Sequence, residues 1–284
     1  MLELLSEHRC FGGRQRYYRH ASAVIGLPMR FSVYLPPQAE AGARMPTLFY
    51  LAGLTCTEET FMIKGGAQRL AAEYGMMLVA PDTSPRGASL PGETDNWDFG
   101  VGAGFYVDAT QAPWSQYYRM YSYIVQELFG LVTTELPGDA MRTGIFGHSM
   151  GGHGALVLAL RNPERFRSVS AFAPIAAPSQ CDWGKKALGG YLGPDTANWE
   201  PYDATALMQV MRSPFPNGIL IDQGMSDQFL HQLHPGAFEV ACQKAGQPLT
   251  LRRHDGYDHG YYFISTFMAD HLAHHARELG AVSA

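Results

Sequence analysis

The chain has 284 residues, of which 46% are hydrophobic and 17% charged, and its formal net charge at pH 7 is −5. A chain of this length buries most of its apolar surface without disulfide or metal staples. The composition excludes an intrinsically disordered chain and a strongly basic nucleic-acid-binding protein. No apolar run reaches the about eighteen residues of a membrane span, and residues 1–13 lack the pattern of a signal peptide, so we expect a cytoplasmic protein.

The predicted elements begin with strands. Residues 29–37 alternate apolar and polar side chains and end in two prolines, whereas residues 46–51 form a continuous apolar run that is typical of a strand buried on both faces. Apolar runs then alternate with helical patterns, which indicates a mainly parallel sheet with helices on both faces. Further strands are expected at residues 76–80, 143–146, 168–172, 218–221 and 249–252. Helices are expected at residues 68–74, 120–134, 151–160, 236–245 and 262–279.

Residues 84–114 form a long stretch that is rich in glycine, proline and aromatic residues and has no clear periodicity. Long loops inside compact domains are usually functional, so we expect this stretch to line a site. No repeat, charge block or low-complexity linker divides the chain, which favours one domain over residues 1–284. The four cysteines have no metal or redox spacing and are expected to be free thiols; they are Cys10, Cys56, Cys181 and Cys242.

The strongest local motif is Gly-His-Ser-Met-Gly at residues 147–151. It follows a predicted strand and precedes a predicted helix, which is the context of a nucleophile elbow. The sharp turn would expose the Ser149 hydroxyl above the sheet, while the N–H groups of the following helix point towards a developing negative charge. We therefore expect Ser149 to be a nucleophile and the Met150 N–H to stabilise an oxyanion. The second oxyanion donor is expected from the loop after the strand at residues 46–51, with the Leu54 N–H as candidate.

A serine nucleophile needs an imidazole base and a carboxylate that orients it, in the chain order serine, acid, histidine. Asp222 and Asp227 both follow a predicted strand. We favour Asp227, because it lies within the loop and can reach a neighbouring loop, and we expect Asp222 to bond turn backbone groups. His259 is the expected base, because it lies between the last strand and the last helix with glycines on either side.

The remaining histidines have weaker claims. His153 is expected to pack against the site or to polarise it, since it does not have the chain order of a base. Three histidines of the last helix are expected to face solvent, and they lack a convincing further metal ligand; they are His271, His274 and His275.

Beyond the elbow, longer stretches of the chain resemble the S-formylglutathione hydrolase (esterase D) family over essentially the whole length. They are CFGGRQRYYRH (10–20), YLAGLTCTEETF (50–61), GHSMGGHGAL (147–156), WGKKALGGYLG (183–193), ILIDQGMSDQFL (219–230) and GYDHGYYFISTF (256–267), together with the loop from residue 82 to 110. The resemblance implies an α/β-hydrolase fold without a large separate cap, and a triad of Ser149, Asp227 and His259. It also implies an oxyanion hole from the Leu54 and Met150 N–H groups.

By the same resemblance, the substrate would be the thioester S-formylglutathione, cleaved to glutathione and formate in formaldehyde detoxification, with side activity on small activated esters. The resemblance implies no metal or organic cofactor and a homodimer. Cys56 matches a family cysteine beside the active site, and its alternative is a buried apolar thiol. Residues 178–186 depart from the family pattern, with Asp182 in place of a proline, which leaves the contacts to glutathione open.

Selectivity for a formyl group requires a small acyl pocket, and large loop residues are candidates to fill it, with core packing as the alternative. They are Trp97, Phe105, Met150 and Trp183. Four basic residues are candidates to attract glutathione, with a solvated surface position as the alternative; they are Lys64, Arg86, Lys185 and Lys186. Three other functions stay open at this point: a general short-chain carboxylesterase, an acyltransferase and a hydrolase-like binding protein.

Overall fold

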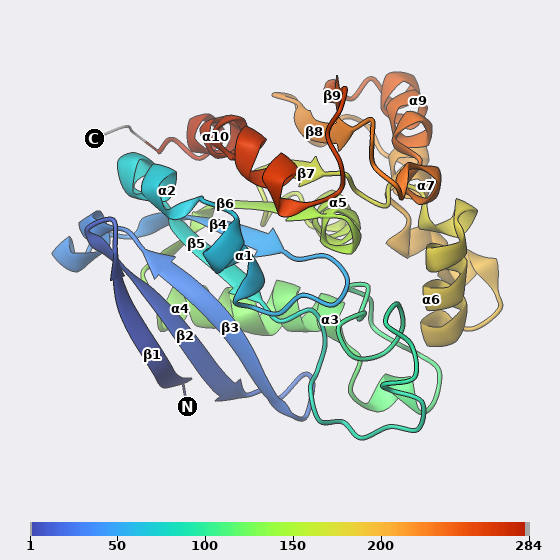
Figure 1. Cartoon of the computed structure of the whole chain (residues 1–284), viewed down its shortest axis with the longest axis horizontal. Helices are drawn as coiled ribbons and strands as arrows, with labels where there is room; N and C mark the ends of the chain where they lie inside the picture. The colour runs from blue at the N-terminus through green and yellow to red at the C-terminus, as the bar shows by residue number, and fades with distance from the viewer. Residues whose placement is uncertain (1, 282–284) are drawn as a thin grey trace.

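One mixed sheet organises the described residues, 2–281, of the computed structural model (Figure 1). The sheet has nine strands in the order β1-β2-β3-β5-β4-β6-β7-β8-β9. The strands are β1 (Leu2–Cys10), β2 (Gly13–Ala21), β3 (Pro28–Leu35), β4 (Met45–Leu51), β5 (Met77–Pro81), β6 (Gly138–His148), β7 (Ser168–Phe172), β8 (Ile219–Gly224) and β9 (Leu249–His254). The pairs from β5 to β9 are parallel, whereas β1, β2, β3 and β5 pair antiparallel.

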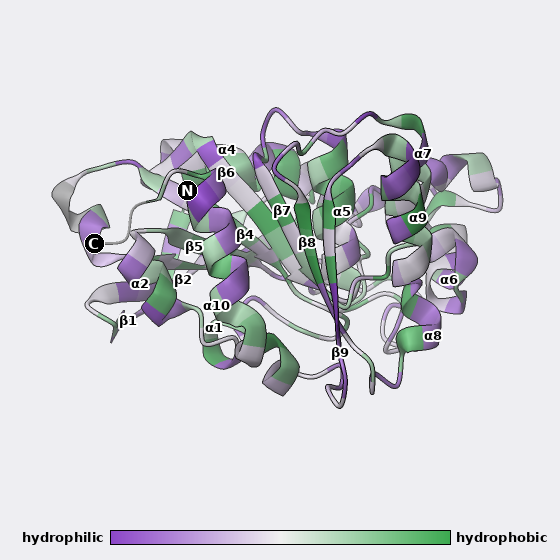
Figure 2. Ribbon diagram, turned by 90° about the horizontal axis from the view of Figure 1, so that it is seen from above, coloured by the Kyte–Doolittle hydropathy of each residue, from purple (hydrophilic) through white to green (hydrophobic). Residues whose placement is uncertain are grey.

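Helices cover both faces of this sheet (Figure 2). They are α1 (Thr60–Lys64), α2 (Gln68–Tyr74), α3 (Met120–Ser122), α4 (Phe129–Thr134), α5 (Met150–Arg161), α6 (Asp182–Leu192), α7 (Ala204–Val210), α8 (Leu230–Leu233), α9 (Pro235–Ala245) and α10 (Tyr261–Glu278). Helices α2 and α10 pack on one face, and α4, α5 and α9 lie on the other. The predicted α/β class and parallel sheet are therefore confirmed.

The sequence patterns located the central elements well and the outer ones poorly. All seven strands expected from residue 29 onwards are present, although β6 starts at Gly138, earlier than expected. Most side chains of β1 are exposed, so this strand lacks the apolar alternation that would have marked its bounds. The expected helix at residues 120–134 is broken into α3, a wider π-helical turn at Tyr123–Leu128, and α4.

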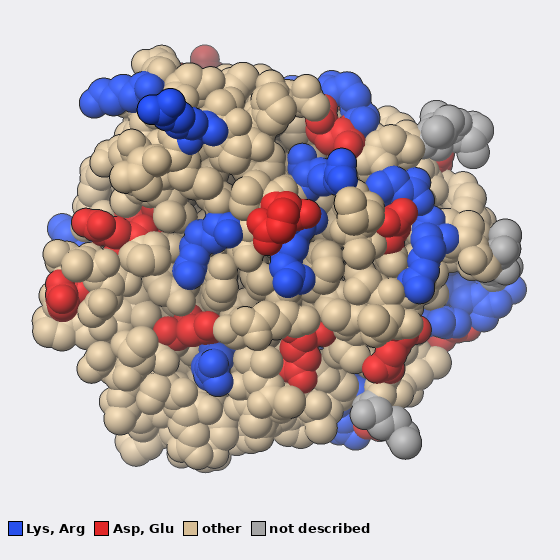
Figure 3. Space-filling view, turned by 180° about the vertical axis from the view of Figure 1, so that it is seen from behind, with Lys and Arg blue, Asp and Glu red and all other residues tan. Residues whose placement is uncertain are grey.

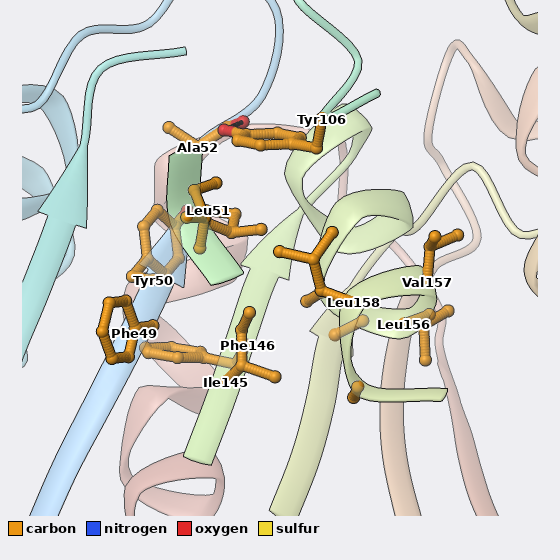
Figure 4. Close-up of a cluster of buried hydrophobic side chains, with 14 of the residues drawn as sticks. Phe49, Tyr50, Leu51, Ala52, Tyr106, Ile145, Phe146, Leu156, Val157 and Leu158 are labelled. Carbon is orange, nitrogen blue, oxygen red and sulfur yellow. Dashed lines mark hydrogen bonds between the residues drawn. The ribbon is translucent and has the colours of Figure 1, made fainter. Parts of the chain in front are cut away.

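The core beneath the elbow is dense and apolar (Figure 4). Every residue of β4 is buried, as the continuous apolar run predicted. Tyr50 of β4 packs edge-on against Phe146 of β6 with 4.8 Å between ring centroids, whereas Phe49 packs against Phe129 and Phe166 on the opposite face of the sheet. The Tyr106 hydroxyl donates a hydrogen bond of 2.8 Å to the Ala52 carbonyl at the end of β4. This packing therefore fixes the ends of β4 and β6, which carry the site.

The expectation that His271, His274 and His275 face solvent is wrong. His271 and His275 are fully buried where α10 crosses β7. The His275 ring bonds the hydroxyls of Ser168 at 2.6 Å and Ser170 at 2.8 Å, and His271 Nδ1 lies 2.7 Å from the same Ser170 oxygen. The apolar pattern could not predict this burial, because the hydrogen-bond partners of the rings are serines on β7, about a hundred residues away in the sequence.

The expectation for Asp222 is also wrong. Its buried carboxylate forms two hydrogen bonds of 2.6 Å with Arg252 and also meets the rings of His254 at 3.1 Å and His271 at 3.2 Å. These partners hold the pKa of Asp222 well below its usual range despite the cost of burial. Asp222 thus ties β8 to β9 and α10 rather than closing a turn.

The surface shows no large patch of one charge on the face opposite to that of Figure 1 (Figure 3). Basic and acidic side chains are interspersed there over a mostly uncharged surface. No helix in the described part of the chain combines the length and apolar character needed to span a bilayer.

The buried histidines make stability depend on pH. Burial lowers the pKa of His153 and of His274 from 6.5 to about 4, and it also lowers the pKa of His271 and His275. Below about pH 6.5 the unfolded chain takes up protons that the folded chain excludes, so the free energy of unfolding falls as pH falls, by up to about 1.4 kcal/mol per pH unit for each histidine. Urea unfolding followed by circular dichroism between about pH 7 and pH 4.5 measures this slope.

His274→Leu tests whether buried histidines cause this pH dependence. One ring nitrogen of His274 is buried and has no hydrogen-bond partner among the described residues. The leucine variant should make the free energy of unfolding depend less steeply on pH, without loss of stability near neutral pH. His231→Gln, at an exposed position, should leave this dependence unchanged. An unaltered slope in His274→Leu would contradict this account.

Candidate active site

Ser149 occupies the sharp turn between β6 and α5 that the motif predicted. Its backbone has φ 57° and ψ −120°, a conformation that non-glycine residues rarely adopt. The Ser149 N–H donates a hydrogen bond of 3.0 Å to the Phe172 carbonyl of β7, and the Ser149 carbonyl accepts one of 2.9 Å from the His153 N–H. The strain is therefore held by the adjacent strand and by the first turn of α5.

Two glycines of the motif are required by contacts with backbone atoms. A Cβ at Gly151 would lie 1.9 Å from the Leu51 carbonyl oxygen, and one at Gly147 would lie 2.2 Å from the Gly151 carbonyl oxygen. Both distances are far below van der Waals contact. The end of β4 can pass this close to the start of α5 only without side chains at these positions.

His259 and Asp227 meet at the same edge of the sheet. His259 Nδ1 lies 2.6 Å from Asp227 Oδ2, with both side chains nearly or fully buried. The Asp227 carboxylate also accepts hydrogen bonds from the Phe229 N–H at 2.8 Å and from Gln223 Nε2 at 3.2 Å. A carboxylate without a proton requires hydrogen on Nδ1 of the histidine, which leaves Nε2 as the basic nitrogen.

Ser149 and His259 line one cavity of about 220 Å³. Of the residues expected around a substrate pocket, Leu54, Cys56, Trp97 and Trp183 also line it. Aromatic rings connect the surface with the imidazole. Trp97 packs edge-on against Trp183 with 5.7 Å between ring centroids, Trp183 lies 4.8 Å from Phe229, and Phe229 lies 5.1 Å from His259.

The loop after β4, which contains Leu54, packs against Ser149 and lines the same cavity. A Cβ built on Gly53 would lie 3.3 Å from Ser149 Cβ, so this loop passes directly over the serine. The neighbouring N–H groups are engaged, because Thr55 donates to the Gly102 carbonyl at 2.9 Å and Cys56 donates to the Gly53 carbonyl at 3.3 Å. Within residues 2–281 the Leu54 N–H has no acceptor. The Met150 N–H is at the first position of α5, where helices have no internal acceptor.

Several expected pocket residues lie elsewhere. Phe105 is fully buried, and its carbonyl lies 3.0 Å from His153 Nε2, so it packs in the core and not in the cavity. Met150 is also fully buried and does not line the cavity. His153 packs against Phe105, with 6.1 Å between ring centroids.

The four basic candidates are also outside the cavity. Arg86 binds the Asp82 carboxylate and the Cys56 carbonyl, which orders the loop from behind. Lys186 binds Asp98 at 2.5 Å. Lys64 lies over the Tyr261 ring at 5.9 Å, and Lys185 is exposed. A basic residue near a motif in sequence gives no information about which side of a loop it occupies.

Sequence reasoning missed five residues that line the cavity: Gly53, Thr55, His148, Phe229 and Tyr261. The His148 ring lies 4.4 Å from the His259 ring, and its nitrogens have no hydrogen-bond partner among the described residues. Burial and the proximity of His259 keep the pKa of His148 well below its ordinary value, so the ring is neutral. The sequence feature that could have indicated His148 was its position directly before Ser149 in the motif.

Cys56 is a thiol and not a thiolate at neutral pH, because burial raises its pKa. This ionisation state makes it a poor competitor to the serine as a nucleophile. No cluster of three or more histidine, cysteine, aspartate or glutamate side chains in residues 2–281 is arranged to hold a metal ion.

Comparisons with known proteins identify the family of the chain. The profile of the putative esterase family matches residues 22–274. The chain is 55% identical to S-formylglutathione hydrolase of Mus musculus over 99% of both chains, and 53% identical to that of Paracoccus denitrificans over 98% of both. The chain belongs to the S-formylglutathione hydrolase family.

A solved structure supports the same assignment. An S-formylglutathione hydrolase from Agrobacterium tumefaciens superposes with a TM-score of 0.94 at 52% identity, covering 98% of this chain and all of the other. A ferulic acid esterase at 18% identity has a TM-score of 0.73 over 94% of this chain, which shows that the fold extends to more distant proteins.

The close approach at Gly151 gives a prediction. Gly151→Ala places a methyl group against the Leu51 carbonyl, so the elbow must shift, and we expect destabilisation of about 1–3 kcal/mol together with loss of esterase activity. Thermal unfolding and turnover of 4-nitrophenyl acetate measure the two effects.

Gly130→Ala is the matched control. A Cβ there meets nothing within 4 Å, and the residue lies inside α4. Alanine should preserve activity and raise stability by about 0.5–1 kcal/mol. Equal behaviour of the two variants would refute the steric explanation.

Proposed function

We propose that this chain hydrolyses the thioester S-formylglutathione to glutathione and formate, with side activity on small activated esters. The observation that carries the proposal is the shared cavity of Ser149 and His259, with His259 bonded to Asp227. The identity of the chain to S-formylglutathione hydrolases over nearly its full length supports the substrate. We place the reaction in formaldehyde detoxification, where this thioester is consumed.

The proposed mechanism begins with proton transfer. His259 Nε2 takes the hydroxyl proton of Ser149 as its oxygen attacks the formyl carbon, and Asp227 stabilises the imidazolium that forms. The carbonyl oxygen becomes an oxyanion that accepts hydrogen bonds from the Leu54 and Met150 N–H groups. The carbon–sulfur bond then breaks, and glutathione leaves either as the thiol, taking the proton from His259, or as the thiolate, in which case His259 releases its proton to solvent before the next step.

Water completes the cycle. His259 removes a proton from a water molecule that attacks the formyl-serine ester, the oxyanion forms again in the same place, and formate leaves as the proton returns to Ser149. A thiolate is a good leaving group, so acylation needs little acid assistance and deacylation is the expected slow step.

The size of the cavity supports a small acyl group. Pockets for drug-sized ligands are usually about 300–1,000 Å³, whereas this cavity has about 220 Å³ and is walled by Trp183, Phe229 and Tyr261. A formyl group and other small acyl groups fit in this volume, whereas a large acyl group does not.

Four cysteines that are all free fit a reducing compartment that contains glutathione, so we place the reaction in the cytoplasm. The homodimer implied by the resemblance stays a prediction, which sedimentation equilibrium tests.

Ser149→Ala removes the proposed nucleophile without adding volume. We expect kcat for S-formylglutathione to fall by on the order of 10⁴- to 10⁶-fold with an unchanged melting temperature. Release of thiol from S-formylglutathione measures turnover, and labelling by a fluorophosphonate probe should disappear in parallel. A variant that keeps normal turnover would exclude Ser149 as the nucleophile. A wild-type kcat/KM that is higher for aryl acetates than for S-formylglutathione would favour a general carboxylesterase.

Asp227→Asn tests the role of the carboxylate. The amide no longer fixes hydrogen on Nδ1, so the ring can present N–H instead of a basic nitrogen to Ser149, and kcat should fall by on the order of 10⁴-fold. Asp258→Asn is the control, because this exposed carboxylate lies next to His259 in sequence but bonds the Gly260 N–H. Similar losses in both variants would argue against a specific role for Asp227.

A further inference from the structure

A second and larger hollow is lined by residues that follow directly on those of the active-site cavity. It has a volume of about 550 Å³ and is lined by β2 and β3 residues, by Thr57–Glu59 after β4, and by residues after β5. Cys56 lines the active-site cavity and the adjacent Thr57 lines this hollow, so one segment of chain separates the two. None of the catalytic groups proposed above lines it.

One side of the hollow carries a carboxylate without a cationic partner. Glu58 is only 4% exposed and lines the hollow, and its carboxylate forms no ion pair among the described residues. Burial and the neighbouring Asp82 raise its pKa, and Arg30 acts on it only at longer range. A buried carboxylate in this state is stabilised by an ammonium group that enters the hollow.

The hollow also carries two arginines on neighbouring strands. Arg19 of β2 and Arg30 of β3 are direct partners in the antiparallel register, and both line the hollow. Like charges directly opposite on neighbouring strands are destabilising. Arg19 is compensated by Glu3 of β1, whereas Arg30 is exposed and forms no hydrogen bond or ion pair through its side chain within residues 2–281. A carboxylate from a ligand would satisfy Arg30.

Arg86 and Asp82, which also line the hollow, neutralise each other. Arg86 forms a pair of hydrogen bonds with Asp82, so neither is available to a ligand. What stays open is an anionic group, Glu58 with the exposed Glu59 beside it, and a cationic group, Arg30. Adjacent ammonium and carboxylate groups are the chemistry of an α-amino-acid head.

We propose that this hollow binds the γ-glutamyl end of the glutathione moiety, with its ammonium at Glu58 and its α-carboxylate at Arg30. This inference rests on the proposed function, because the proposed substrate carries such a head. The chain keeps the two sites close: Cys56 and Glu58 are two residues apart, at most about 7.6 Å between Cα atoms, which is shorter than the span of about 10 Å of an extended tripeptide. The hollow is therefore a specificity subsite for the leaving group.

The kinetic test compares two substrates in the full chain. Glu58→Gln and Arg30→Gln should each raise KM for S-formylglutathione about 10-fold, as loss of one charge-assisted contact predicts. Their kcat for S-formylglutathione and their kcat/KM for 4-nitrophenyl acetate, which has no glutathione part, should stay unchanged. Glu164→Gln and Arg212→Gln remove the same charges at exposed positions and should change neither substrate.

A substrate analogue isolates the ammonium contact. Replacing the γ-glutamyl group of S-formylglutathione by glutaryl removes only the amino group. Wild-type enzyme should show about a 10-fold higher KM for this analogue, and Glu58→Gln should no longer distinguish it from S-formylglutathione. Equal KM values of the two compounds with wild-type enzyme would overturn the assignment of Glu58.

Direct binding separates this inference from the proposed function. Calorimetry with glutathione and Ser149→Ala needs no turnover, and binding should weaken about 10-fold when Glu58→Gln or Arg30→Gln is added. If the wild-type chain fails to hydrolyse S-formylglutathione, the proposed function fails while this titration still tests the hollow. Glutathione binding that is indifferent to both substitutions would refute the subsite, as would a KM effect seen instead in Lys185→Gln.

Discussion

The strained backbone of Ser149 is the constraint on which the other features of the site depend. A positive φ at this residue turns the chain from β6 into α5 within a single position, so the hydroxyl stands clear of the sheet and the first N–H groups of the helix lie beside it. The turn requires the end of β4 to pass within contact of Gly151, and the loop that follows brings Gly53, the neighbour of Leu54, against Ser149. The same packing therefore positions the proposed nucleophile and the segments that carry the proposed oxyanion donors.

The carboxyl end of β8 shows how two similar acids acquire different tasks. Asp222 belongs to the strand itself and is surrounded by Arg252, His254 and His271, so every lone pair is used in joining secondary-structure elements. Asp227 lies a few residues further on, where the loop has left the sheet, and its carboxylate reaches His259. Gln223 holds it from the side. Both carboxylates are buried, so their different contacts come from the side chains that each can reach.

Much of this arrangement was predictable from the sequence. The apolar run of β4 and the Gly-X-Ser-X-Gly turn are local signals, and chain order restricts the acid and the base to few positions. The orientation of Phe105, Arg86 and Lys186 was not predictable, because it depends on which side of a long irregular segment each residue occupies. The buried role of His271 and His275 was missed because two serines on β7, each with an ordinary strand pattern around it, supply the hydrogen bonds.

The packing of α10 links the stability of the fold in acid to the position of His259. This helix begins at Tyr261, two residues after His259, and its histidines His271 and His275 are buried against β7, where the charged form of the ring is disfavoured. Proton uptake in acid therefore acts against the packing of α10 on β7, and the helix affected is the one that follows the proposed base.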